Sequence, residues 1–190
     1  MTEICEIRWH GRGGQGVVTA AQLLAQAALV EDKHFQSFPE FGPERMGAPI
    51  RAFSRVSSKP IHLYCNVDNP KFVVVLDSTL IGLVNVTEGL VDGGAIIVNT
   101  SEDPAVLKGK LGIKNGKVFT VDASKIAKDE IGRPIPNTPM LGALLKASGV
   151  LKLDTVAKHL RDSFGGKFSA EVVEGNVRAL TRSYEEVRSA

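Results

Sequence analysis

Residues 4–18, ICEIRWHGRGGQGVV, hold the pattern that decides the fold of this chain. An alternating apolar segment runs into a loop rich in glycine, and a helical pattern follows. Gly11, Gly13 and Gly16 satisfy G-x-G-x-x-G between a strand and a helix, the context in which this spacing binds phosphate groups. Glycine lets a ligand approach the main chain, and the N–H groups that open a helix attract anions. We therefore predict a phosphate-binding turn.

The predicted binding turn comprises the consecutive residues Gly11, Arg12, Gly13, Gly14, Gln15 and Gly16. Arg12 adds a positive charge and a planar set of donors suited to phosphate. A dinucleotide would also need an acidic residue at the end of the second strand, but Asp32 precedes that strand and Glu40 follows it. A phosphate-bearing ligand other than NAD fits better. A turn that contacts no ligand remains the alternative.

The composition is that of an ordinary soluble globular protein, with 190 residues of which 43% are hydrophobic and 23% charged. This length suits one domain over residues 1–190. A net charge of +2 without a basic run gives no support for a nucleic-acid partner. The apolar runs are too short for a membrane span, and no signal-peptide core opens the sequence. The expected location is the cytoplasm.

Strands and helices alternate along the chain, which predicts an α/β fold. Strands are expected at residues 3–9, 34–38, 71–76, 94–98 and, last, 117–121. Helices are expected at residues 17–30, 78–86, 124–131, 154–164 and 170–188, after Pro104, and from Thr138, which would cap its helix. Alternation at 50–56 and 61–67 predicts a β-hairpin at a sheet edge. Together these elements indicate a doubly wound, Rossmann-like, mostly parallel sheet with an added β-hairpin and C-terminal helices.

Polar residues follow three of the predicted parallel strands. Asp77, Asn99 and Asp122 stand at the carboxyl ends, the rim where open α/β sheets bind ligands. Their alternative role is helix capping or turn formation. The proline- and glycine-rich stretch 39–49 should lie over the same rim. It carries Glu40, Glu44 and Arg45, and we expect it to pack against a partner, a self-contained surface loop being the alternative.

Neither cysteine belongs to a C-x-x-C pair, so a metal or iron–sulfur site built by this chain alone is not expected. Cys5 and Cys65 both lie in strand-like runs and are interpreted as buried free thiols. The histidines are scattered without metal-ligand spacing, and three of them fall in strand-like segments; they are His10, His34, His62 and His159. No catalytic nucleophile with a neighbouring base is identified.

Four sequence blocks resemble the gamma subunits of 2-oxoacid:ferredoxin oxidoreductases, most closely those acting on pyruvate. They lie in order and with matching spacing at residues 8–16, 38–51, 68–70 and 136–142. Met46 departs from the pattern, since related chains often carry a small residue or glycine there.

The resemblance implies a part in the reversible oxidative decarboxylation of a 2-oxoacid with coenzyme A, with electrons passed to ferredoxin. Thiamine diphosphate and Mg²⁺ would belong to the alpha and beta subunits, and iron–sulfur clusters to beta and delta. The gamma chain would have no activity alone and would help to position coenzyme A. We assign that contact to Gly11–Gly16 together with Glu44 and Arg45.

Other functions stay open from the sequence. The chain could be a purely structural subunit whose glycine turn packs against a partner. It could serve a 2-oxoisovalerate or 2-oxoglutarate oxidoreductase, because the substrate pocket would lie on other chains. A free-standing nucleotide-binding enzyme is a more distant third function.

Overall fold

The computed structural model describes residues 4–40 and 47–190, which form one seven-stranded sheet in the order β2-β3-β1-β4-β5-β6-β7. Strands β1, β4, β5 and β6 are mutually parallel, and β2, β3 and β7 add antiparallel pairs at the two edges. The strands are β1 Cys5–Arg12, β2 His34–Pro39, β3 Pro49–Ser57, β4 Phe72–Val75, β5 Ala95–Asn99, β6 Lys117–Val121 and β7 Arg188–Ser189. The predicted doubly wound, mostly parallel α/β sheet is confirmed.

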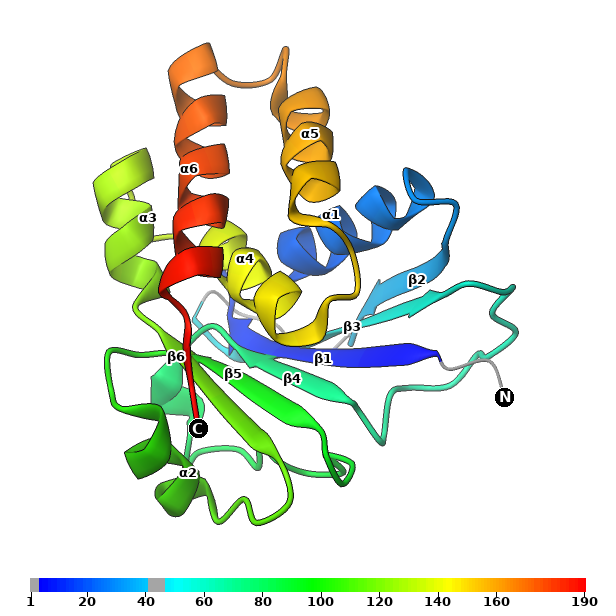
Figure 1. Cartoon of the computed structure of the whole chain (residues 1–190), viewed down its shortest axis with the longest axis vertical. Helices are drawn as coiled ribbons and strands as arrows, with labels where there is room; N and C mark the ends of the chain where they lie inside the picture. Colours follow the sequence, from blue (N-terminus) through cyan, green and yellow to red (C-terminus); the bar gives the residue numbers. More distant parts are fainter. Residues whose placement is uncertain (1–3, 41–46) are drawn as a thin grey trace.

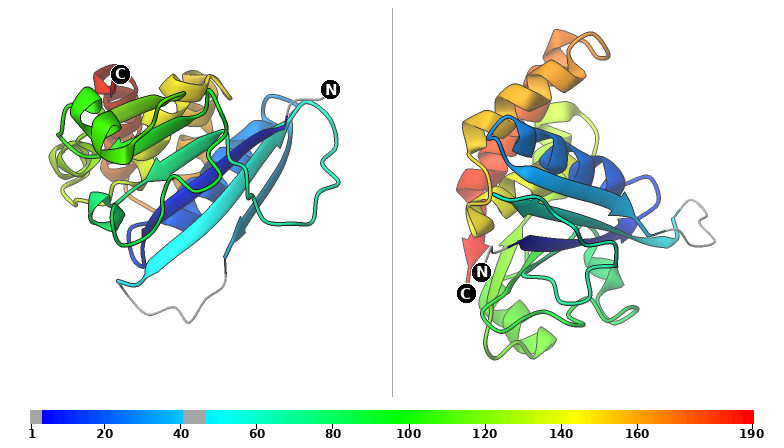
Figure 2. Two further views of the ribbon diagram at one scale, coloured as in Figure 1. Left: turned by 90° about the horizontal axis from the view of Figure 1, so that it is seen from below. Right: turned by 90° about the vertical axis from the view of Figure 1, so that its right-hand side faces the viewer.

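The helices cover the two faces of the sheet unequally (Figure 1). One face carries α1 Val17–Leu29, α3 Ala123–Ile131, α4 Asn137–Ser148, α5 Leu153–Phe164 and α6 Ala170–Glu186. The other carries the short 3₁₀ helix η1 Ser78–Leu80 and α2 Pro104–Leu111. Figure 2 (right) shows α5 and α6 standing as a helical hairpin that projects beyond the sheet.

Helix α1 packs on the sheet through small side chains. The predicted stripe is buried, and its members are Val17, Ala20, Ala21, Leu24, Ala27 and Ala28. They join Trp9 and Leu76 in the larger core, while a smaller core fills the side of η1 and α2. All four residues of β4 are buried, as expected for a central parallel strand covered on both faces.

The predicted hairpin between residues 50–56 and 61–67 is wrong in its second strand. The antiparallel strands at this edge are β2 and β3, and β3 is already paired on both sides, by β2 and β1. Residues 61–67 therefore cannot pair with β3 as the second strand of that hairpin. Their backbone is instead held by side chains: Gln36 donates to Leu63 O at 2.9 Å and Arg55 to Asn66 O at 3.0 Å.

Other expectations also need correction. The helix expected at 78–86 is only η1, because Ile81 is already extended and Gly82 has a φ of 91°. Strand β6 is not the last, since two residues of β7 pair with it after α6. Strand β1 continues to Arg12, so Gly11 and Arg12 are strand residues, not loop residues.

Three side-chain predictions are corrected as well. Cys65 and His62 lie outside the strands, and Cys65 is exposed while Cys5 is half-buried. Thr138 does not cap α4 but donates its hydroxyl to Asn176 Oδ1 at 2.9 Å, and the helix begins at Asn137. The burial and the hydrogen bonds of these side chains depend on tertiary contacts, which the local sequence does not specify.

A buried polar pair lies on the face of β1 opposite α1. Arg8 and His10 are 2% and 3% exposed, and Arg8 Nε donates to His10 Nε2 at 3.0 Å. Arg8 also donates to the carbonyls of Val86 and Glu88. Burial, followed by the charges of Arg8 and Arg51, lowers the pKa of His10 to about 3. His10 is therefore a neutral acceptor at pH 7.

This pKa makes the fold sensitive to mild acid. The unfolded chain binds a proton at His10 below about pH 6.5, whereas the folded chain does not until about pH 3. Stability is thus lost as the pH falls below about 6.5, at ~1.4 kcal/mol per pH unit. Between pH 7 and 5 the wild-type free energy of unfolding in urea should fall by about 2 kcal/mol more than that of His10→Gln. Equal losses in the two proteins would contradict this assignment.

Candidate functional site

The glycine turn, Gly13–Gly16, joins β1 to α1 at the carboxyl end of the parallel strands. Gly14 and Gly16 have φ values of 96° and 77°, which other residues adopt only with strain. Gly16 also packs against α4, since a Cβ there would lie 2.7 Å from Asn137 Nδ2. At Gly11 a Cβ would lie 2.5 Å from Val17 Cγ2. The glycines thus allow both the turn and the close packing of strand and helix.

Arg12 is tied to the protein on three sides. Its Nε donates to Asp77 Oδ2 at 3.1 Å, one terminal nitrogen to Gly47 O at 3.1 Å and the other to Thr79 Oγ1 at 3.0 Å. The side chain is 28% exposed, so its charge also faces the surroundings of the turn. Arg12 therefore fixes the start of the turn to the end of β4.

Gln15 closes the turn from within. Its Oε1 accepts from the Arg12 N–H at 2.8 Å, and its Nε2 donates to Asp77 Oδ2 at 2.9 Å. The Gln15 N–H in turn donates to Arg12 O at 3.1 Å. The turn is thus held rigid by its own side chains before any ligand arrives.

Asp77 is the hub of these contacts. Burial alone would raise its pKa, but hydrogen bonds from Thr79 and Gln15 and the charge of Arg12 outweigh burial and hold the pKa below its ordinary value. Its Oδ1 also accepts from the Thr79 N–H at 2.9 Å, so Asp77 caps η1. The carboxylate is ionised at neutral pH and offsets the charge of Arg12.

The rim residues predicted from strand ends do lie together. Asn99 Nδ2 donates to Leu76 O and to Ser124 Oγ, both at 2.8 Å, and so bridges the ends of β4 and β5 to α3. Asp122 caps α3 through the Lys125 N–H. A hollow of about 360 Å³ opens here, lined among others by Gln15, Asp77, Asn99, Asp122 and Ser124. Asp77, Asn99 and Asp122 therefore line the predicted rim, and Asp77 and Asp122 also have the alternative role of helix caps.

Gln15 joins this hollow to the glycine turn, whose main-chain N–H groups differ in their hydrogen bonding. The Gly13 N–H donates a hydrogen bond to Ala48 O at 3.1 Å. Within residues 4–40 and 47–190, the N–H groups of Gly14 and Gly16 have no hydrogen-bond acceptor, and no side chain caps α1. Unpaired donors beside a helix N-terminus favour an anion such as phosphate.

The comparisons with known proteins match nearly the whole chain. A family model described as pyruvate ferredoxin/flavodoxin oxidoreductase matches residues 6–186. The chain belongs to this family. The resemblance inferred from the four sequence blocks is thereby confirmed.

Relatives in the pyruvate ferredoxin/flavodoxin oxidoreductase family match over almost their full length. The pyruvate synthase subunit PorC of Thermotoga maritima is 50% identical over 96% of this chain and 94% of its own. The common subunit gamma of the pyruvate/ketoisovalerate oxidoreductases of Pyrococcus furiosus is 47% identical over 95% of each chain. The crystal structure of pyruvate oxidoreductase subunit PORC from Thermotoga maritima has a TM-score of 0.87, with 46% identity over 99% of both chains.

The structure does not test every predicted site residue. Glu44 and Arg45 lie outside the described residues, as does most of the stretch 39–49 that was expected to pack on a partner. Glu40 forms an ion pair with Arg51, with one oxygen 2.7 Å from an Arg51 terminal nitrogen. Asp32 lies in the turn between α1 and β2, with a φ of 53°, and so precedes β2 as expected.

Sequence reasoning missed two residues of the site, Asn137 and Thr79. Asn137 belongs to a block that supported the resemblance, yet nothing local indicated that α4 would bring it against Gly16. Thr79 follows Asp77 by two residues, a spacing that allows the side-chain contact now seen. Among the described residues, no group of three His, Cys, Asp or Glu is placed to hold a metal ion.

Proposed function

We propose that this chain is the gamma subunit of a pyruvate:ferredoxin oxidoreductase, an enzyme complex that converts pyruvate and coenzyme A to acetyl-CoA and CO₂ and passes the electrons to ferredoxin. The observation that carries the proposal is the 50% identity to a pyruvate synthase subunit over almost the full length of both chains. Residues 1–190 act in it as a single domain, in line with the family match over 6–186.

Within the complex this subunit positions coenzyme A as a substrate. The pyrophosphate lies at the glycine turn, where the Gly14 and Gly16 N–H groups and the start of α1 attract its charge. Gly11 and Gln15 hold the shape of the turn and Arg12 offsets Asp77 beside it. Glu44 and Arg45, which lie outside the described residues, contribute to the same contact. Glu40, the acid that directly follows β2, is paired with Arg51, so we assign phosphate contacts and no ribose contact to this site.

In this proposal thiamine diphosphate and Mg²⁺ belong to the alpha and beta subunits, and the iron–sulfur clusters belong to beta and delta. The described part of this chain has no cluster of metal ligands and contains no helix long and apolar enough to cross a bilayer. We place the complex in the cytoplasm. The Pyrococcus furiosus relative is named as common to oxidoreductases for pyruvate and ketoisovalerate. This supports placing substrate choice on another subunit, so a 2-oxoisovalerate or 2-oxoglutarate enzyme is the alternative.

Coexpression with the three partner subunits tests this proposal. We expect the chain to copurify with them in one stoichiometric complex that reduces ferredoxin in the presence of pyruvate and coenzyme A. The chain purified alone should lack this activity and should show no visible absorption from a flavin or an iron–sulfur cluster. Activity or a chromophore in the isolated chain would indicate a free-standing enzyme instead.

A further inference from the structure

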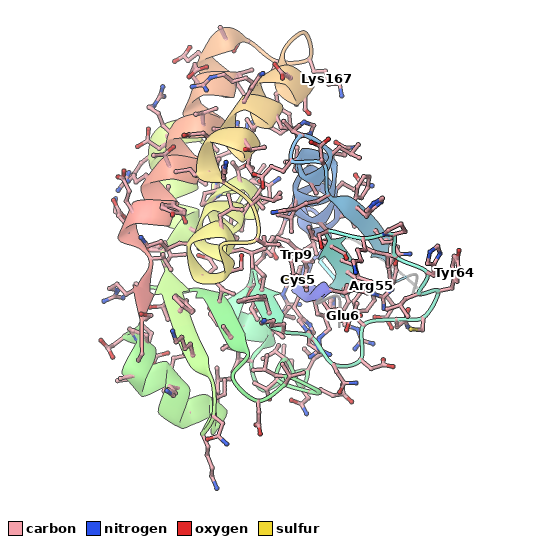
Figure 3. All side chains as sticks on the ribbon, turned by 45° about the vertical axis from the view of Figure 1, so that its right-hand side comes forward. Cys5, Glu6, Trp9, Arg55, Tyr64 and Lys167 are labelled. Carbon is pink, nitrogen blue, oxygen red and sulfur yellow. The ribbon has the colours of Figure 1, made fainter. Side chains whose placement is uncertain are left out.

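A groove of about 800 Å³ lies between α1 and the hairpin of α5 and α6; it shares no lining residue with the hollow beside the glycine turn, although Asn137, which packs against Gly16, also lines the groove. We call it the helix groove. Its walls are mainly apolar and are built by Leu23, Ile131, Ile135, Phe164, Phe168 and Val172. Arg133 and Lys167 stand among the lining residues. Figure 3 shows Lys167 at the outer end of the helical hairpin.

The apolar wall has a fixed shape. The rings of Phe164 and Phe168 meet edge to face, with centroids 5.3 Å apart. The turn that carries them is closed by bonds from the Lys167 and Phe168 N–H groups to Phe164 O, at 3.0 and 3.1 Å. Phe168 is nevertheless 53% exposed and Ile135 37% exposed. Apolar side chains held in place and open to solvent are typical of an interaction surface.

The groove carries an uncompensated positive charge. Neither the Arg133 nor the Lys167 side chain has an ionic or hydrogen-bonding partner among the described residues, and no Asp or Glu lines the groove there. Outside the groove, Arg161 pairs with Glu174 and Arg178 with Glu130. A partner that offers carboxylates beside apolar side chains would therefore complement this surface.

Two polar side chains of the groove, those of Asn176 and Ser163, are engaged within the protein. Asn176 binds Thr138 and the Val172 carbonyl, and Ser163 contacts His159 at 3.0 Å. On the α1 side the groove follows residues 19–26, about two turns of helix, or ~10 Å. A channel of this kind between helices suits another helix.

We propose that the helix groove docks an amphipathic helix of another subunit of the oxidoreductase, with its apolar stripe against Phe164 and Phe168 and its carboxylates on Arg133 and Lys167. The inference rests on the proposed function, because it names the surface through which the gamma chain is held in the complex. Phe168 is the central anchor, since aromatic residues carry much of the binding energy of interfaces.

The docking proposal is tested by letting wild-type and variant chains compete for assembly into the complex. Wild-type and Phe168→Asp chains of distinguishable mass are coexpressed with the partner subunits, and their ratio in the purified complex is compared with their ratio in the soluble extract. We expect Phe168→Asp to be incorporated at least tenfold less often than the wild type, and Arg133→Glu/Lys167→Glu to show a loss in the same direction. The matched control is Val106→Asp on α2, equally 53% exposed but on the opposite face. It should compete evenly.

Incorporation of Phe168→Asp at the wild-type ratio would overturn the docking inference and leave the proposed function intact, whereas failure of the wild-type chain to enter any complex would overturn the proposed function itself. A photo-crosslinking residue at position 168 identifies the occupant. A crosslink to a helix of another subunit supports the inference. A crosslink to a second copy of this chain, or none to protein, overturns it.

Discussion

Replacing Trp9 by alanine should destabilise the isolated chain by about 3–5 kcal/mol, a large part of the ~5–15 kcal/mol typical of a folded domain. Trp9 is fully buried between β3 and α1, and its indole N–H donates to Ser54 Oγ at 3.0 Å. Ser54 in turn donates to Ala21 O, which links the strand to the helix. The substitution leaves a cavity and also deprives the Ser54 hydroxyl of a partner.

Urea unfolding measures this effect, and Tyr64 supplies the control. Tyr64 is 93% exposed and stands on the outside of the molecule (Figure 3), so Tyr64→Ala should change the free energy of unfolding by less than about 0.5 kcal/mol. Trp9→Phe should lie between the two, because it keeps most of the volume and loses the hydrogen bond. A loss below about 1 kcal/mol for Trp9→Ala would mean that the core is not organised around this residue.

The parallel part of the sheet could be predicted because its pattern has one physical meaning. A short run of β-branched residues, as in β4 and β5, is stable only when both faces are covered. Carboxyl ends of neighbouring parallel strands share one rim, so the meeting of Arg12 with Asp77 follows in outline from their places at the ends of β1 and β4.

The rest of the fold and of the site depends on contacts between residues far apart in the sequence, which no local sequence pattern encodes. Alternation at 61–67 resembles a strand, but the predicted hairpin needs a free side of β3, which is already paired on both sides. The two residues of β7 pair only because α6 ends beside β6. The contact of Asn137 with Gly16 joins residues far apart in sequence and depends on how α4 packs.

Replacing Arg12 by alanine should raise the apparent KM for coenzyme A in the assembled complex by roughly 5- to 150-fold, the equivalent of losing about 1–3 kcal/mol of charge-assisted hydrogen bonding. The change removes a cation from the turn, releases Gly47 and Thr79, and leaves the Asp77 carboxylate unopposed beside the phosphate. Asp77→Asn should act in the opposite direction, because it keeps an acceptor for Arg12 and removes the negative charge.

The central claim is that this chain supplies the coenzyme A contact of an oxidoreductase whose chemistry takes place on other subunits. The most direct test compares two rates in complexes carrying wild-type, Arg12→Ala or Asp77→Asn chains. We predict that reduction of the enzyme by pyruvate alone is the same in all three, while the apparent KM for coenzyme A rises in Arg12→Ala and is unchanged or lower in Asp77→Asn. An unchanged coenzyme A dependence in Arg12→Ala would contradict the account and favour a purely structural subunit.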